Sequence, residues 1–268
     1  MIKILLLIIL ITLVITLLTF YLYKNVKNNE AFTTYNNFDY ADKLSKDDIK
    51  HLKDGQIKMG NMMKQFDNIC QKYKIRYFLI AGSLIGVLLY GGWIPWDGDM
   101  DLEVHEDDYD KLKRALKTEL PKNMWFQDYE TDKHYPINNN IKGKIRDLNS
   151  CYIEYTNNGG THWHNGLQLD INIYKEDNNG RIFFPDDTNV NYLTREDIYP
   201  IKRVSFKNGN DLFYVNVMNN PEKYLEKKYS KNWNICLPKN ERYPHEGKID
   251  AYKTCEFHYD KYPKLYKK

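Results

Sequence analysis

Hydrophobic and polar positions divide the chain into one long apolar run followed by short, regularly patterned segments. Residues 4–23 are apolar except for threonines, whose hydroxyls a helix can satisfy internally. Because about 20 such residues span a hydrocarbon core of about 30 Å, the run predicts a transmembrane helix within residues 1–24. A cleaved signal peptide would have a shorter apolar region and a small-residue cleavage site, and residues 19–24 contain no such pattern. We therefore expect an anchor.

The segment after the apolar run is polar. Residues 25–44 are rich in asparagine and lack apolar periodicity, which predicts a stalk between the anchor and a folded domain. Lys3 precedes the apolar run while Lys24 and Lys27 follow it, so the flanking positive charges nearly balance. The positive-inside rule therefore does not decide the membrane orientation.

A helix is expected to begin the folded domain. Ser45 and Asp48 resemble a capping box, and apolar residues then recur at helical spacing. These residues are Met59, Met62, Met63, Phe66, Ile69, Cys70 and Tyr73. We interpret this stripe as the core-facing side of the helix rather than as a cofactor site.

Strand and helix signals alternate after this helix. Residues 77–81 form an apolar run that predicts a buried strand, Gly82-Ser83 predicts a turn, and residues 84–90 a helix. Further strands are expected at residues 100–104, 142–146, 151–155 and 167–174, hairpin turns at Asn178-Asn179-Gly180 and Asn208-Gly209, and helices at residues 107–120 and 221–229. The pattern predicts a mixed α/β (α+β) domain with one sheet over residues 45–235.

Length and charge limit the possible organisation and partners. The chain has 268 residues and a net charge of +3. This length accommodates one sizeable domain plus an anchor, and the modest charge argues against nucleic acid as a principal partner. A basic extension, residues 236–268, follows the expected domain. We interpret its end, residues 261–268, as a solvated tail, with contact to anionic lipid as the alternative.

The cysteine spacing does not indicate a zinc site. Cys70, Cys151, Cys236 and Cys255 are widely separated, with no C-x-x-C pair and no suitable His/Cys spacing. In an oxidising compartment Cys236 and Cys255 could pair, and the sequence does not distinguish that pair from buried free thiols.

Candidate chemistry is concentrated in three alternating aspartates. Asp97, Asp99 and Asp101 stand at the entrance to a predicted strand, so their carboxylates are expected on one side of it. Like charges so close together are costly, and hard divalent cations prefer carboxylate oxygens, so the cluster predicts a Mg²⁺ or Mn²⁺ site. A bare D-x-D is more often a solvated acidic turn. Here the apolar lead-in, residues 93–96, favours fixed metal ligands.

Two further features complement these aspartates. Gly82-Ser83 lies at a strand-to-helix turn, where backbone N–H groups can approach a phosphate, with a plain turn and helix cap as the simpler alternative. Asp170 interrupts the otherwise apolar segment 167–173, where a carboxylate needs a partner. That partner is either the predicted metal, with Asp170 as a third ligand, or a buried ion pair with Arg146 or a lysine.

Together these motifs resemble the signature of the LicD family. The resemblance rests on residues 81–86, 92–101, 144–150, 166–171 and 220–229, in the family's order and spacing, and covers about residues 55–235. Within Trp96-Asp97-Gly98-Asp99-Met100-Asp101, Gly98 stands where many members have another aspartate. That departure bears on metal affinity and on activity.

The resemblance implies a nucleotidyltransferase-like fold, similar to fukutin and fukutin-related protein, with a mixed sheet flanked by helices. It also implies a metal-dependent transferase that moves a phospho-alcohol, such as phosphocholine or ribitol phosphate, from a CDP-linked donor to a glycan hydroxyl and releases CMP. Asp99 and Asp101 would hold the metal on the donor's diphosphate, and Asp170 would be a third ligand or a base. Asp97 would be a fourth ligand, and Gly82-Ser83 would contact phosphate.

Basic and aromatic residues near these motifs have two interpretations each. Arg146 or Lys144 could neutralise charge on the leaving CMP, with surface ion pairing as the alternative. His162 and His164 could act as acid/base groups or metal ligands, with loop hydrogen bonding as the commoner role. Trp163 could stack on a cytosine or sugar, with packing under the sheet as the alternative.

Two rival functions stand beside the transferase. A nucleotide-sugar glycosyltransferase also binds metal and diphosphate through a D-x-D pair, although the Gly-Ser turn argues against it. A catalytically inactive, membrane-anchored protein that binds a glycan or a partner would keep the fold, and Gly98 supports that reading. The expected location is a membrane, with a single span and with the domain in the lumen if the chain is eukaryotic or acts in a eukaryotic host.

Overall fold

The computed structural model describes residues 12, 14–16, 19, 46–136, 141–154, 164–187, 189–235, 237–238, 241 and 246–266. The chain divides into two compact units, Met1–Asp39 and Tyr40–Lys268. In the first unit the hydroxyls of Thr16 and Thr19 donate to the carbonyls of Thr12 and Ile15, as expected for threonines in an apolar helix. No helix among the described residues is both long and apolar enough to span a bilayer. Most of the predicted span and the stalk lie outside these residues.

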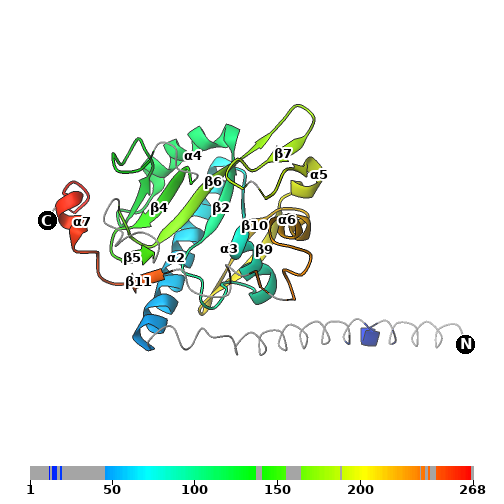
Figure 1. Ribbon diagram of the computed structural model, residues 1–268, viewed down its shortest axis with the longest axis horizontal. Helices are drawn as coiled ribbons and strands as arrows, with labels where there is room; N and C mark the ends of the chain where they lie inside the picture. Colours follow the sequence, from blue (N-terminus) through cyan, green and yellow to red (C-terminus); the bar gives the residue numbers. More distant parts are fainter. Residues whose placement is uncertain are drawn as a thin grey trace, which may run out of the picture. The chain divides into compact units, whose positions relative to one another are not determined.

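The second unit is a mixed α/β fold with a mixed sheet flanked by helices (Figure 1). Its seven-stranded sheet has the order β1-β2-β6-β4-β3, and β7 and β8 continue it from β6. β2 and β6 are parallel, and the other pairs are antiparallel. The strands are β1 (Tyr77–Leu79), β2 (Asp101–His105), β3 (Met124–Gln127), β4 (Gly143–Asp147), β6 (Gln168–Glu176), β7 (Arg181–Phe183) and β8 (Leu193–Thr194).

Two small sheets accompany the main one, so the expectation of a single sheet is wrong. β9 (Lys202–Asn208) pairs with β10 (Asp211–Val217), and β5 (Cys151–Glu154) pairs with β11 (Glu246–Asp250). The β9–β10 hairpin turns at the predicted Asn208-Gly209 and contacts β1 and α2 instead of joining the main sheet. The predicted turn between β6 and β7 is also confirmed, with Gly180 at φ 72°.

The helices largely match the predicted segments. They are α2 (Lys46–Tyr73), α3 (Ala81–Ile85), the π-helix η1 (Gly86–Tyr90), α4 (Glu106–Glu119), α5 (Arg195–Ile198), α6 (Pro221–Lys228) and α7 (Phe257–Lys261). Met59, Met63 and Phe66 of α2 are fully buried, which confirms the predicted stripe as core. α2 and α4 contact each other and β6.

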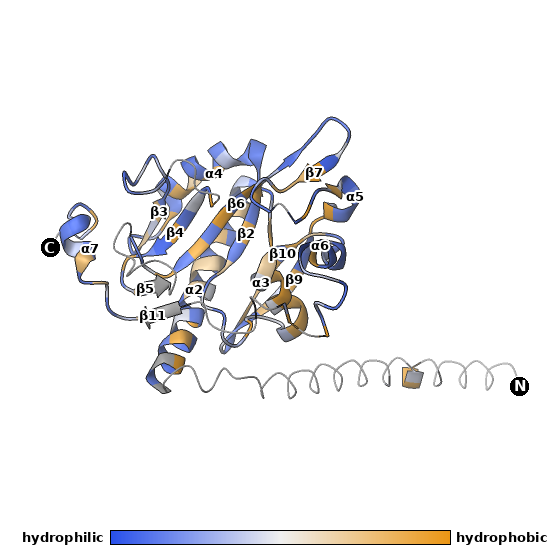
Figure 2. Ribbon diagram, viewed as in Figure 1, coloured by the Kyte–Doolittle hydropathy of each residue, from blue (hydrophilic) through white to orange (hydrophobic). Residues whose placement is uncertain are grey.

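The two faces of the main sheet differ in polarity. Along β6, hydrophobic residues alternate with hydrophilic ones, as Figure 2 shows. Leu169 and Ile171 occupy one face, and Asp170 and Asn172 occupy the other, because successive strand residues point in opposite directions. All four residues are buried. One face therefore contributes to the hydrophobic core, while the other buries polar groups that require partners.

Candidate active site

The strand register places a row of polar side chains across the sheet. Asp101 of β2 lies opposite Asp170 of β6, which lies opposite Lys144 of β4, which in turn lies opposite Gln127 of β3. Directly opposite residues on neighbouring strands are about 5 Å apart and share a face. The fold therefore brings two of the predicted site aspartates side by side.

Asp170 is held in a buried ion pair. Nζ of Lys144 lies 2.8 Å from both carboxylate oxygens of Asp170 and 3.0 Å from Oε1 of Gln168. The two charged side chains are only 3% and 4% exposed. The predicted partner of Asp170 was either a metal or a buried ion pair with Arg146 or a lysine. The structure contains the ion pair, with Lys144. A carboxylate has about four lone-pair sites, so this pairing still leaves capacity for a cation.

Arg146 lies beside this ion pair. It donates to Oε1 of Gln127 at 2.7 Å, to the carbonyl of Gly166 at 2.9 Å and to Oε1 of Gln168. Arg146 and Lys144 are both buried, so the alternative of surface ion pairing is wrong. Their alternation on β4 aims both cations at the face that carries Asp170.

The aspartate cluster follows a fixed lead-in. Asp101 begins β2, whereas Asp97 and Asp99 precede the strand and are half-buried. Gln56 of α2 donates to the carbonyls of Ile94 and Asp97 at 3.0 and 2.8 Å. Ile94 is buried, as is Trp96. The apolar lead-in is thus packed and hydrogen-bonded rather than a solvated turn, and its role in fixing metal ligands stays a prediction.

Gly82 and Ser83 lie in the first turn of α3 rather than in a turn before the helix, and they adjoin these aspartates. Oγ of Ser83 accepts the N–H of Asp101 at 2.8 Å, so Ser83 positions the start of β2. A Cβ on Gly82 would lie 2.9 Å from Oδ2 of Asp97 and 2.6 Å from Oε2 of Glu241. The missing side chain thus lets two carboxylates approach the turn. Ala81 has φ 48°, in the left-handed region that costs energy for a residue with a Cβ.

The electrostatics of the site are dominated by like charges. Desolvation, followed by the charges of Asp99, Asp170 and Glu241, raises the pKa of Asp101 well above its ordinary value. The positive charge of Lys228 lowers the pKa of Asp101, but its contribution is smaller than each of these. Carboxylates crowded in this way are a common feature of sites that bind cations or transfer protons.

Two acidic residues of this region were missed by sequence reasoning. Glu103 is 1% exposed, and burial together with Asp186 and Asp187 raises its pKa. Its position in the sequence could have indicated this, because Glu103 follows Asp101 by two residues on β2 and so points to the same face of the sheet. Glu241 is held by Trp96, whose Nε1 donates to its carbonyl at 2.8 Å, and by the hydroxyl of Tyr229, which donates to Oε1 at 2.8 Å. No sequence pattern marked Glu241.

The predicted metal site has suitable chemistry but no assembled ligand set. Among the side chains that the structure describes, no three His, Cys, Asp or Glu residues are arranged to hold a metal ion. The donors near Asp101 are nevertheless all carboxylates, the ligands that Mg²⁺ and Mn²⁺ prefer. Burial and then repulsion between carboxylates raise the pKa of Asp101, and a divalent cation would relieve that repulsion. By donor type and charge, the residues therefore fit such an ion.

His164 belongs to a buried cluster rather than to the aspartate row. Its Nδ1 accepts the N–H of Gly166 at 3.1 Å, and its ring stacks on that of His258 at 3.9 Å. Nε2 of His258 accepts the N–H of Asn165 at 2.8 Å. Hydrogen bonding within the loop is thus confirmed for His164. His162 and Trp163 lie outside the described residues.

The C-terminal segment covers this cluster. Tyr262 is buried, and its hydroxyl donates to Oδ2 of Asp132 at 2.9 Å. The hydroxyl of Tyr266 lies 2.5 Å from Nε2 of His164. The interpretation of residues 261–268 as a solvated tail is therefore wrong for these two tyrosines, since aromatic packing and hydrogen bonds outweigh the local basic charge.

A disulfide joins this segment to the domain. Cys255 pairs with Cys151 because β11 pairs with β5 and brings the two Cα atoms to 4.8 Å. The considered pair of Cys236 with Cys255 is therefore wrong, and Cys236 lies outside the described residues. Cys70 is a buried free thiol.

The histidine cluster predicts an acid-sensitive fold. Burial, then the charges of Arg146 and Lys261, lowers the pKa of His258 from 6.5 to about 3. Between these two values the unfolded chain binds a proton that the folded chain does not. Stability should therefore fall as the pH is lowered below about 6.5, by up to about 1.4 kcal/mol per pH unit for this group.

We expect the wild type to lose more stability than His258→Gln when the pH is lowered from 7.5 to 4.5, because glutamine can accept the Asn165 N–H without titrating. Denaturant midpoints at several pH values would measure the difference. Parallel curves for the two proteins would contradict the assignment of this sensitivity to His258.

Comparison with known proteins adds to this geometry. A family model described as LicD/FKTN/FKRP, nucleotidyltransferase domain, matches residues 74–213. The lipopolysaccharide cholinephosphotransferase LicD of Haemophilus influenzae is 30% identical over 141 residues, which cover 50% of this chain and 48% of that protein. The match thus spans about half the length of this relative. Residues 74–213 include the whole polar row, whereas Glu241 and His258 lie beyond them.

Proposed function

The chain belongs to the LicD/FKTN/FKRP nucleotidyltransferase family, and from this premise we propose that it is a phosphotransferase that moves a phospho-alcohol from a CDP-linked donor to a glycan hydroxyl. Family membership and the likeness to a cholinephosphotransferase support phosphoryl-group transfer. Phosphocholine is the first candidate for the transferred group and ribitol phosphate the second. CMP is the proposed leaving group, and Mg²⁺ or Mn²⁺ the proposed cofactor.

The observation that carries this proposal is the position of Asp101 and Asp170, directly opposite each other on parallel strands and next to the Gly82-Ser83 turn. Gly82 is flanked by carboxylates, which would repel a phosphate at this turn. A divalent cation held by Asp99, Asp101 and Asp170, with Asp97 beside them, would neutralise the carboxylates and so let a phosphate approach the turn. When bound, such an ion would neutralise charge on the donor's diphosphate.

The chain's own residues can serve the remaining steps. The glycan hydroxyl attacks the phosphorus that carries the alcohol, and the bond from that phosphorus to the CMP oxygen breaks. As the alternative to its role as a metal ligand, Asp170 would accept the hydroxyl proton, and Lys144 would fix its orientation through contacts with both carboxylate oxygens. Arg146 is buried beside Asp170, where it would supply positive charge to the leaving CMP. Asp170 would thus act beside two fixed cations, Lys144 in the row and Arg146 next to it.

Donor binding provides the test. We expect the full-length protein in detergent, with Mg²⁺, to bind one of CDP-choline, CDP-ribitol and CDP-glycerol and not UDP-glucose, as measured by calorimetry. Asp99→Ala plus Asp101→Ala should abolish this binding while the melting temperature persists. Asp107→Asn, a change at a carboxylate that is 77% exposed on α4, is the matched control. Binding of the UDP-sugar would favour a glycosyltransferase, and a folded protein that binds no nucleotide would favour an inactive binding protein.

A further inference from the structure

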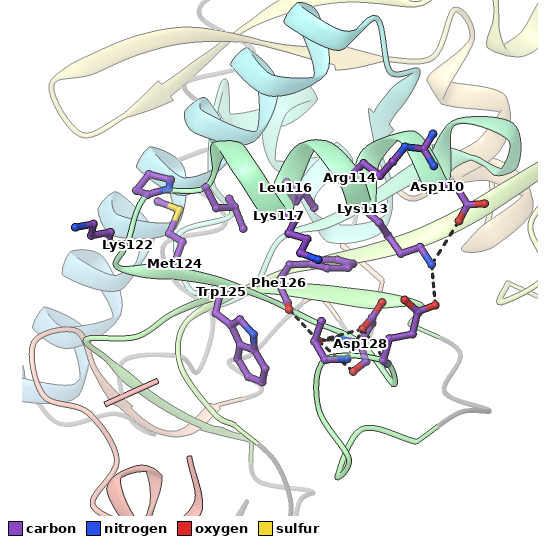
Figure 3. Close-up of a pocket in the computed structure, with 14 residues that line it drawn as sticks. Asp110, Lys113, Arg114, Leu116, Lys117, Lys122, Met124, Trp125, Phe126 and Asp128 are labelled. Carbon is purple, nitrogen blue, oxygen red and sulfur yellow. Dashed lines mark hydrogen bonds and ion pairs between the residues drawn. The ribbon is translucent and has the colours of Figure 1, made fainter. Parts of the chain in front are cut away.

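A pocket of about 730 Å³ lies away from the polar row, between α4 and the end of the sheet at β3 (Figure 3). Its volume falls within the range of about 300 to 1,000 Å³ that is usual for ligand pockets. Figure 3 shows Lys122 and Asp110 toward opposite ends, with Lys117 and Phe126 between them. None of the residues that line this pocket belongs to the polar row.

Part of the positive charge that lines the pocket is uncompensated. Lys113 forms ion pairs with Asp110 and Glu130 at 3.4 and 2.9 Å, so its charge is neutralised within the pocket. In contrast, the exposed Lys117 and Lys122 make no ion pair with any residue in the described ranges. These two lysines are therefore available to an anion.

The floor of the pocket is apolar and aromatic. Leu116, Leu120 and Met124 line it together with Phe126. Trp125 points to the opposite side of β3 from Phe126 and is half-exposed, so the lining continues around the outer edge of the sheet. Aromatic faces of this kind pack against the C–H faces of sugar rings.

Asp128 adds a buried acceptor to this lining. Its Oδ1 accepts the N–H groups of Glu130 and Thr131 at 3.0 and 2.9 Å and the Thr131 hydroxyl at 3.0 Å. Its Oδ2 is buried and has no hydrogen-bond partner among the residues described. An orphaned carboxylate oxygen costs roughly 1 to 3 kcal/mol, a cost that a donated ligand hydroxyl would remove.

We propose that this pocket binds an acidic saccharide, with a phosphate attracted by the positive charges of Lys117 and Lys122, a sugar ring against the aromatic floor, and a hydroxyl donated to Oδ2 of Asp128. The saccharide would be the part of the glycan acceptor remote from the reacting hydroxyl, and in this respect the inference rests on the proposed function. Gln127, adjacent to Asp128, stands in the polar row three strands from Asp101, a separation of about 14 Å. An oligosaccharide can cover that distance around the edge at Trp125.

Calorimetric titration of the full-length protein, without donor or metal, tests this proposal. The probes are pentamannose carrying one phosphate and unphosphorylated pentamannose. We expect saturable binding of the phosphorylated probe, weakened about five- to tenfold in Lys117→Ala plus Lys122→Ala. Asp128→Asn keeps the Oδ1 acceptor that shapes the turn and should weaken both probes about tenfold. Lys50→Ala plus Lys53→Ala, two exposed lysines of α2, should change nothing.

Several results would overturn the proposal. Absence of saturable binding to either saccharide would do so, as would equal affinity in the wild type and both pocket variants with unchanged melting temperatures. Lysine-dependent binding to vesicles of phosphatidylcholine and phosphatidylglycerol, without saccharide binding, would assign the lysines to a lipid surface instead. Because no donor is present, failure here leaves the transferase proposal standing, and failure of donor binding leaves this one standing.

Discussion

Replacing Asp101 by asparagine is expected to reduce phospho-alcohol transfer by at least about 100-fold and, in metal-free buffer, to raise the melting temperature. The loss of activity follows from removing a charge at the centre of the cluster. The gain in stability follows from the raised pKa of Asp101, because burial and then the charges of Asp99, Asp170 and Glu241 disfavour its ionised form. Replacing a residue that serves stability alone would instead lower the melting temperature.

Calorimetric melting with EDTA and with Mg²⁺ distinguishes the role of Asp101 in metal binding from its effect on the stability of the metal-free protein. Added Mg²⁺ should raise the melting temperature of the wild type, because a ligand that binds only the folded state stabilises it, and should have little effect on Asp101→Asn. Asp107→Asn should respond to the metal as the wild type does. A variant that melts lower than the wild type in EDTA would show that Asp101 has a stabilising role, contrary to our account.

Replacing Lys144 by methionine is expected to destabilise the protein by about 3 to 5 kcal/mol, because it leaves the Asp170 carboxylate buried without its cation. Lys144 donates to both oxygens of Asp170 and to Gln168, and both charged side chains are almost fully buried. Urea unfolding midpoints at pH 7 would measure the loss.

The double variant Lys144→Met plus Asp170→Asn is the matched comparison. It removes both charges, so it should recover a large part of the lost stability while activity stays low. Equal midpoints for the single and double variants would show that the cost of Lys144→Met comes from packing rather than from an unpaired carboxylate. The coupling between the two changes measures the interaction directly.

Elements with strong local signals were predicted well from the sequence. The α2 stripe, the amphipathic α4 and the strand predicted at residues 77–81, which is observed at Tyr77–Leu79, rest on the spacing of apolar residues, which the core imposes directly. Asp170 was placed correctly as a carboxylate in a buried strand. Its partner was not determined, because strand register decides between Lys144 and Arg146, and register depends on contacts across the sheet.

Other parts of the candidate site depend on contacts between distant segments. β3 was missed because Met124–Gln127 is short and mixed in polarity, yet it ends the path of strands and lines the pocket. Glu241 reaches Gly82 only because Trp96 and Tyr229 hold it there. The ring of His258 stacks on that of His164 because β11 and the disulfide hold the C-terminal segment against the domain. Membrane attachment through residues 1–24 and a luminal domain stay predictions.

The most direct test of the proposed reaction is the identity of the nucleotide released from a CDP-alcohol donor. Phosphorus NMR of the reaction of the full-length protein with Mg²⁺, donor and a glycan acceptor would identify it. Transfer of a phospho-alcohol breaks the diphosphate, so the account predicts CMP and a new phosphodiester on the glycan, both absent with Asp101→Asn. Release of CDP, or a glycan that gains no phosphorus, would contradict it.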